Sequence, residues 1–159
     1  AYQALKDPER ALVHFLEALN EDASHVPSRY HAGLMYHKLK NHADAVRCFT
    51  AVLSAAGDER RVREARGLAY QAMEDHALAV RDFEAAISID PDRGEPYYCR
   101  AVSLLALGDP NGCVDDLNAA LSRRWQRAEV FDTRATANLS LHRFEDAVRD
   151  YTEAVNMSP

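Results

Sequence analysis

Histidine and cysteine are the residue types in this sequence best suited to hold a metal ion or to act as a nucleophile. The 159 residues include seven histidines and three cysteines. Metal ligands on one helix face lie three or four residues apart, but His31 and His37 are six apart and His42 lies beyond the expected turn. The cysteines are scattered, at Cys48, Cys99 and Cys113. This spacing predicts neither a metal site nor a disulfide framework.

Motifs for catalysis are also missing from the sequence. It has no glycine-rich phosphate loop, no Gly-x-Ser-x-Gly and no Cys-x-x-Cys. Nor does any pair of residues suggest perturbed protonation of the kind that acid–base chemistry requires. We therefore predict that the chain is not an enzyme and binds no cofactor.

Composition and charge exclude other classes of function. Apolar residues make up 47% and charged residues 28%, as in ordinary globular domains. The net charge of −6 argues against nucleic acid as the main partner, since binding to phosphates needs a basic surface. The longest apolar runs, such as Leu104 to Leu107, have four residues and are too short to span a bilayer. The short apolar runs predict no membrane insertion, and the few scattered cysteines predict an intracellular, cytoplasmic protein.

The positions of small and bulky residues repeat along the whole chain. Gly33 and Gly67 are 34 residues apart, and two further steps of 34 reach the small residues Ala101 and Ala135. A second column of mostly small residues contains Ala11, Ala45, Ala79, Cys113 and Ala147, and a bulky column contains Phe15, Phe49, Phe83, Leu117 and Tyr151. Both columns run without an insertion or deletion, which indicates a structural repeat.

The period and the motif together resemble the tetratricopeptide repeat. That family has Gly-x2-Tyr in a first helix, Ala-x3-Phe in a second helix and Pro at the end. The first part is matched by Gly33–Tyr36 and Gly67–Tyr70, the second by Ala45–Phe49 and Ala79–Phe83 among others, and the third by Pro91 and Pro159. The copy at 94–127 departs most, with Trp125 where proline is expected.

The resemblance implies an all-α fold, a right-handed α-solenoid of antiparallel helix pairs with a 34-residue period. First helices are expected at 27–40, 61–74, 95–107 and 129–141, and second helices at 9–22, 43–56, 77–89, 111–123 and 145–157. We expect a single array over 1–159, cut from a longer protein, with a partial repeat at 1–25 and repeats at 26–59, 60–93, 94–127 and 128–159.

Two further columns predict specific contacts. Asp7, Asn41, Asp75 and Asp109 stand where second helices begin, and Asp and Asn are favoured N-caps. Arginine and aspartate recur 16 residues apart as Arg66–Asp82, Arg100–Asp116 and Arg134–Asp150, and the copy with Ala32 in place of Arg has Cys48 in place of Asp. Because antiparallel helices bring these columns level, we predict stacked, partly buried ion pairs. The alternative is coincidence among solvated charges.

The resemblance also implies a function, because family members commonly bind a peptide or partner helix along an inner wall of first helices. The inward residues are Tyr30, Leu34 and His37; Arg61, Glu64, Leu68 and Gln71; Glu95, Tyr98, Val102 and Leu105; and Glu129, Asp132, Thr136 and Leu139. Their apolar strip with acidic flanks predicts a protein segment with apolar anchors and basic flanks, and disfavours an acidic tail.

A second function of a different class remains open at this stage. The array could instead be a rigid scaffold that braces a larger assembly through its edges and end faces, with the wall unused. Each solenoid copy presents an apolar face to its neighbour, so self-association through the ends is also expected if the ends are uncovered. Neither the partner nor the pathway follows from the residues.

Overall fold

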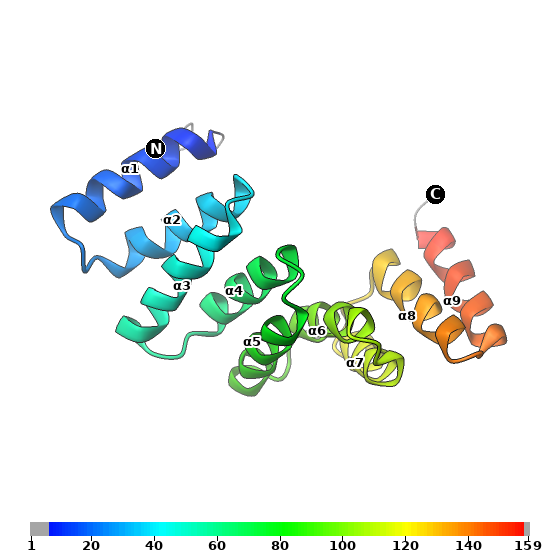
Figure 1. The fold of residues 1–159 in the computed structure, drawn as a ribbon. Coiled ribbons are helices and arrows are strands. Elements are labelled where there is room, and N and C mark those ends of the chain that lie inside the picture. The colour runs from blue at the N-terminus through cyan, green and yellow to red at the C-terminus, as the bar shows by residue number, and fades with distance from the viewer. Residues whose placement is uncertain (1–6, 158–159) are drawn as a thin grey trace. The chain divides into compact units, whose positions relative to one another are not determined.

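The computed structural model describes residues 7–157, and within that range the chain forms nine α-helices and no strands (Figure 1). The first helices of the repeat are α2 (Val26–Lys38), α4 (Arg60–Ala72), α6 (Gly94–Ala106) and α8 (Ala128–Ser140). The second helices are α1 (Pro8–Glu21), α3 (His42–Ala56), α5 (His76–Ile89), α7 (Pro110–Ser122) and α9 (Phe144–Met157). This confirms the predicted all-α repeat fold. The beginning of the expected partial repeat and Pro159 lie outside the described residues.

The helices belong to two compact units that divide between Asp75 and His76. In the first unit α1, α2, α3 and α4 pack in sequence, and in the second unit α5 to α9 do the same. Successive helices within each unit run antiparallel, joined by short turns (Figure 1). The exact repeat boundaries and the right-handed superhelix of the whole array stay predictions.

Three of the predicted N-caps are present. The Asp7 carboxylate accepts hydrogen bonds from the backbone N–H groups of Glu9 and Arg10, both at 3.2 Å. The Asp109 side chain accepts from Gly112 N at 2.9 Å, and the Asn41 side chain accepts from Asp44 N at 3.3 Å. Each cap satisfies a backbone donor that the first helical turn leaves without a partner. These residues therefore fix where α1, α3 and α7 begin.

The first helices end one or two residues earlier than predicted, for a reason that the sequence columns did not reveal. At each end one residue has a left-handed backbone: Lys40 and Glu74 with φ 62°, Gly108 with φ 80° and His142 with φ 57°. After α2, Lys40 N donates to His37 O at 3.0 Å and Asn41 N donates to Tyr36 O at 2.9 Å, which is a Schellman motif. The other three ends repeat this pair of bonds. This motif terminates each first helix.

Replacing Lys40 with glycine is expected to raise the free energy of unfolding by about 0.5–1 kcal/mol. A left-handed conformation is strained for a residue with a Cβ, and glycine relieves that strain at some cost in chain entropy. Gly108 already occupies the equivalent position after α6. Urea denaturation measures the change. Lys38→Gly, inside α2, is the control and should destabilise instead.

Small residues allow the helices of the first unit to approach closely. Ala45, Phe49, Val52 and Val62 are at most 1% exposed and form its core. A Cβ added to Gly33 would lie 2.7 Å from Phe49 Cε1 and 3.1 Å from Cys48 Cβ. The small column therefore leaves the space that the bulky column fills, as the repeat pattern predicted.

The core of the second unit is built the same way, although it contains the copy that departs most from the family pattern. Ala101, Cys113, Leu117 and Val130 are fully buried and form one cluster. Burial raises the pKa of the Cys113 thiol to about 12, so the thiol stays protonated and acts as a small apolar side chain. Trp125, in place of proline, packs against this cluster.

Candidate functional site

Within each unit the first helices contact one another across the repeat, but the second helices do not. In the first unit α2 touches α4, whereas among the described residues α1 and α3 make no such contact. In the second unit α6 touches α8, and the described parts of α5, α7 and α9 do not meet. A row of helix pairs bends toward the layer whose members lie closer together. We call the faces of α2 and α4, and of α6 and α8, the first-helix walls of the two units.

On the wall of the first unit, several predicted residues are occupied in packing. Tyr30 and Leu34 are half-buried and pack against the core formed by Phe49 and Val52. Burial raises the pKa of the Tyr30 hydroxyl. Arg61 and Leu68 are exposed, with Leu68 at 40%, while His37, Glu64 and Gln71 are half-buried. The accessible apolar surface of this wall is thus on α4.

On the wall of the second unit, α6 supplies packing and α8 supplies accessible groups. Tyr98 and Leu105 pack against the core, and Glu95 and Val102 are half-buried. A side-chain hydrogen bond joins Tyr98 to Thr133 of α8, while burial raises the pKa of the Tyr98 hydroxyl. The four wall residues of α8 are all exposed: Glu129, Asp132, Thr136 and Leu139, the last at 41%.

The acidic flanks differ in how far other charges neutralise them. Glu64 accepts two hydrogen bonds from Arg60 Nη1, both at 2.7 Å, and Glu95 pairs with Arg93 at 3.3 Å. Glu129 and Asp132 take part in none of the ion pairs of the described residues. The free negative charge of the walls therefore lies on α8, which the residue pattern alone did not distinguish from the other acids.

Two of the three predicted Arg–Asp pairs are present inside the second unit. Arg100 donates from Nε and Nη2 to the two Asp116 oxygens, both at 2.7 Å. Arg134 donates to the Asp150 oxygens at 2.9 and 2.5 Å. Hydrogen bonds to Asp116 raise the pKa of Arg100 further above its ordinary value. The pair Arg66–Asp82 would join residues of different units and stays a prediction.

Comparisons with known proteins identify repeats of one family in part of the chain. A family model for the tetratricopeptide repeat matches residues 26–59 and 61–93. The chain carries tetratricopeptide repeats. No curated protein sequence matches it.

Solved structures of MamA share the fold of this tetratricopeptide-repeat chain. One aligns with a TM-score of 0.90 at 14% identity, over 98% of this chain and 91% of that chain. MamA from Desulfovibrio magneticus RS-1, from residue 41 to its end, gives 0.92 at 16% identity, over 98% and 89%. MamA AMB-1 gives 0.82 at 22% identity, over 95% and 89%. At these identities the likeness shows the fold alone.

Tetratricopeptide repeats mediate binding between proteins, and the family consists in general of non-catalytic interaction modules. Family and fold together thus support a role in protein interaction or scaffolding. No helix within residues 7–157 has both the length and the apolar character to cross a bilayer.

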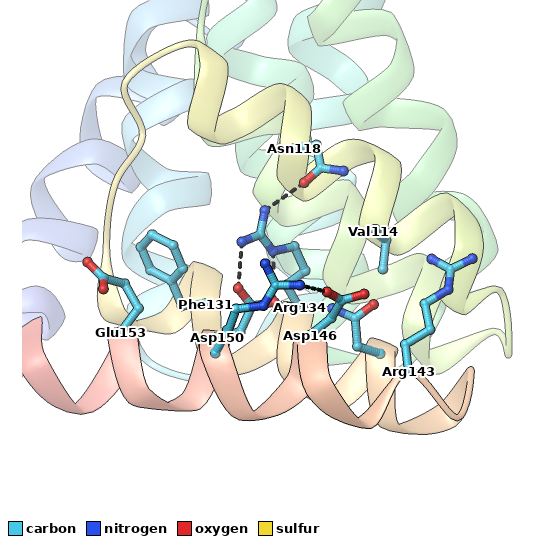
Figure 2. A pocket seen from close by; sticks show the side chains of 10 residues that line it. Val114, Asn118, Phe131, Arg134, Arg143, Asp146, Asp150 and Glu153 are labelled. Atoms are coloured by element: carbon cyan, nitrogen blue, oxygen red, sulfur yellow. Dashed lines mark hydrogen bonds and ion pairs between the residues drawn. The ribbon is translucent and has the colours of Figure 1, made fainter.

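A polar cavity of about 560 Å³ lies among α7, α8 and α9 of the tetratricopeptide array, and sequence analysis did not anticipate it. Figure 2 shows Arg134 in it between Asn118 and Asp150, and the Arg134 Nη1–Asn118 Oδ1 distance is 2.6 Å. Arg149 donates to Asp146 in the same cavity. The charges of Arg134 and Arg149 are therefore neutralised within the chain.

The repeat also brings together two histidines that the spacing argument kept apart. His37, in the last turn of α2, and His42, at the start of α3, have their Nδ1 atoms 3.1 Å apart. The turn after α2 folds the chain back and creates this contact. Burial lowers the pKa of His37, and the positive charge of protonated His42 lowers it further.

This histidine pair predicts a pH dependence of stability. The pKa of His37 is lower in the folded chain than its ordinary value of 6.5, so the unfolded chain binds protons more readily. The stabilisation is complete above that value and is lost as the pH falls below it. His37→Gln is expected to lessen the drop in the urea midpoint between about pH 7 and pH 5. His14→Gln, on the exposed part of α1, is the control, and an equal drop in both variants would contradict the prediction.

Proposed function

We propose that the chain is a non-catalytic protein-interaction module whose first-helix walls bind an extended or helical segment of another protein. The observation that carries the proposal is the direct contact of α2 with α4 and of α6 with α8. It makes the first helices the inner, more crowded layer of each unit. A long segment of a partner can contact several helices of an inner layer at once, so this layer suits an extended ligand.

The accessible side chains define the chemistry of the proposed ligand. Leu68 and Leu139 are 40% and 41% exposed and offer apolar contacts. Glu129 and Asp132 are exposed acids without an ion pair among the described residues. A segment with apolar anchors and basic flanks complements this surface, whereas an acidic tail or a nucleic acid would be repelled. The proposed setting is intracellular.

Selection of peptides from a random display library against the 159-residue chain tests the proposal. We expect enrichment of apolar residues flanked by lysine or arginine. Leu139→Asp should weaken binding of the selected peptides about tenfold or more, the loss of one well-placed apolar anchor. Val13→Asp, at an exposed apolar residue of α1 that is 52% accessible, is the control and should change nothing. Equal effects of both substitutions would contradict the proposal.

Charge reversal adds a second test. Asp132→Lys should weaken binding and make the remaining binding less sensitive to salt. Glu64, another acid of the walls, is a poorer choice because its reversal also breaks the hydrogen bonds to Arg60. Binding that keeps its salt dependence in Asp132→Lys would contradict the role of this acid.

A rigid scaffold is the second candidate, and one observation favours it. Helix α9 exposes Val148 at 65%, Val155 at 69% and Met157 at 41%, an apolar face that suits assembly with a neighbour or a second copy. Under this function Val148→Asp should abolish assembly, measured by sedimentation, and Leu139→Asp should not. The opposite pattern favours the wall.

A further inference from the structure

The contact between His37 and His42 has the spacing of two ligands of one metal ion. Their Nδ1 atoms lie 3.1 Å apart. In a tetrahedral zinc site, where each Zn–N bond is about 2.0–2.1 Å long, two imidazole nitrogens lie about 3.3–3.4 Å apart. At the right angles of a square-planar or octahedral site, bonds of this length give about 2.8–3.0 Å. The observed distance falls between these values, so a small rotation of the rings is enough to direct both lone pairs at one ion.

The backbone holds the two histidines close together before any ion binds. His37 is in the last turn of α2, and His42 is the first residue of α3. Between them the Schellman bonds fix the turn, from Lys40 N to His37 O at 3.0 Å and from Asn41 N to Tyr36 O at 2.9 Å. Two ligands on a fixed turn lose little conformational freedom when they bind an ion, which favours binding over that of two independent imidazoles.

The two facing nitrogens need a proton or a cation between them, because their lone pairs repel each other. In the metal-free chain one ring donates its Nδ1–H to Nδ1 of the other ring, at 3.1 Å. A metal ion takes the place of this hydrogen when the donor ring changes tautomer and carries the hydrogen on Nε2. Both rings then stay neutral and face the ion with Nδ1, so no proton has to leave the protein.

Packing at the turn does not require histidine at these two positions. In the second unit the equivalent positions hold only apolar residues. They are Leu105 and Pro110 at the turn after α6, and Leu139 and Phe144 at the turn after α8. Both turns keep the same pair of Schellman bonds. Apolar side chains thus satisfy the fold at this place, and the two imidazoles of the first unit add nitrogen ligands that the fold does not need.

No third side chain within residues 7–157 completes the site. In this range no group of three or more His, Cys, Asp or Glu residues could hold a metal ion. His37 and His42 are both half-buried, so water reaches the contact. Water therefore fills the other coordination positions, which makes the site weaker than a structural zinc site with four protein ligands.

We propose that His37 and His42 form a two-histidine site for a divalent transition-metal ion, with their Nδ1 atoms as the protein ligands and water as the other ligands. Imidazole nitrogen suits Zn²⁺ and Ni²⁺, whereas Mg²⁺ prefers oxygen ligands. The bound ion links the end of α2 to the start of α3 and stabilises this turn. The proposal does not depend on ligand binding by the first-helix walls, although His37 is a residue of the first-unit wall.

Isothermal titration calorimetry of the 159-residue chain with Zn²⁺ or Ni²⁺ at neutral pH is the first measurement. We expect one ion per chain, and a loss of affinity of about tenfold or more in His37→Gln and in His42→Gln, because a single imidazole cannot chelate the ion. Mg²⁺ should not bind. Circular dichroism checks that both variants keep their helices.

Two control variants separate this site from other metal-ligating side chains. His14→Gln, on the exposed part of α1, and Cys48→Ser, at a half-buried thiol of α3, should bind Zn²⁺ and Ni²⁺ as tightly as the unchanged chain. Absence of saturable binding would overturn the proposal, as would binding that neither His37→Gln nor His42→Gln weakens.

Nuclear magnetic resonance of the imidazole nitrogens identifies the ligand atoms. Zn²⁺ should shift the Nδ1 signals of His37 and His42 and leave the hydrogen on Nε2 in both rings. Coordination through Nε2 of either ring would contradict the geometry from which the site is inferred.

A second pair of histidines at an equivalent turn tests the role of the turn itself. Leu139→His combined with Phe144→His places the pair after α8, at residues that are 41% and 60% exposed. The chain with both substitutions should bind two ions, and Leu139→His alone should bind one. This gain of a site does not require His37→Gln to fold. A single bound ion in the doubly substituted chain would overturn the inference from turn geometry.

Discussion

Asp116→Ala is expected to lower the free energy of unfolding by about 2–4 kcal/mol. The substitution leaves the Arg100 guanidinium without the two carboxylate oxygens that it contacts at 2.7 Å. The side chains are only 21% and 9% exposed, for Arg100 and Asp116 respectively, so water cannot fully replace the lost bonds. An unpaired charge at this depth costs more than the loss of a surface ion pair. Urea denaturation followed by circular dichroism measures the effect.

A double-mutant cycle separates the contribution of the Arg100–Asp116 ion pair to stability from the other contacts of the two side chains. Arg100→Met combined with Asp116→Ala should cost less than the sum of the single substitutions, because the second removes a charge that the first has already left unpaired. Asp115→Ala, the exposed neighbour on α7, should change stability by less than about 0.5 kcal/mol. A loss for Asp116→Ala no larger than this control would show that the ion pair contributes nothing.

Gly33→Val is expected to cost about 3 kcal/mol, near the upper end for overpacking of a core. Even a Cβ at this position would lie 2.7 Å from Phe49 Cε1, and Phe49 is fully buried and has no free space to move into. The small gain in helix propensity over glycine offsets little of this cost. Thermal or urea unfolding measures it, and Ala43→Val on the exposed side of α3 is the matched control.

Replacing the Phe49 ring with a smaller side chain tests whether a clash with this ring causes the loss of stability. Phe49→Leu removes the ring atoms nearest to Gly33, so Gly33→Val with Phe49→Leu should cost less than the two single losses added together. Additive losses would show that the valine is harmful for another reason, such as its contact with Cys48 Cβ at 3.1 Å.

Much of the local structure could be predicted because the same residue types recur at equivalent positions in several copies of the repeat. Each second helix begins within one residue of the predicted position, since caps such as Asp109 and Asn41 are local signals. The Arg100–Asp116 and Arg134–Asp150 contacts also followed, because two columns 16 residues apart face each other whenever adjacent helices are antiparallel. The ends of the first helices were less well predicted, since Lys40, Glu74 and His142 do not have the glycine that usually marks a left-handed residue.

The candidate wall was harder to predict, because the type of a residue does not say whether its side chain is buried in packing or paired with another charge. Tyr30 and Tyr98 match the inward face but are half-buried in packing. Among the acids, Arg60 and Arg93 neutralise Glu64 and Glu95 but leave Glu129 and Asp132 free. Such differences arise from side-chain conformations, which a 34-residue register does not fix.

The sequence by itself determined the helix pairs, the close approach at Gly33 and the two ion-pair contacts, because each depends on residue types that recur at a fixed spacing in several copies. Only the tertiary structure decided which charges of the walls stay available and which side chains of the inward face are used in packing. The physical reason is that covering a surface depends on three-dimensional packing of neighbouring copies, whereas the repeat pattern describes each copy alike.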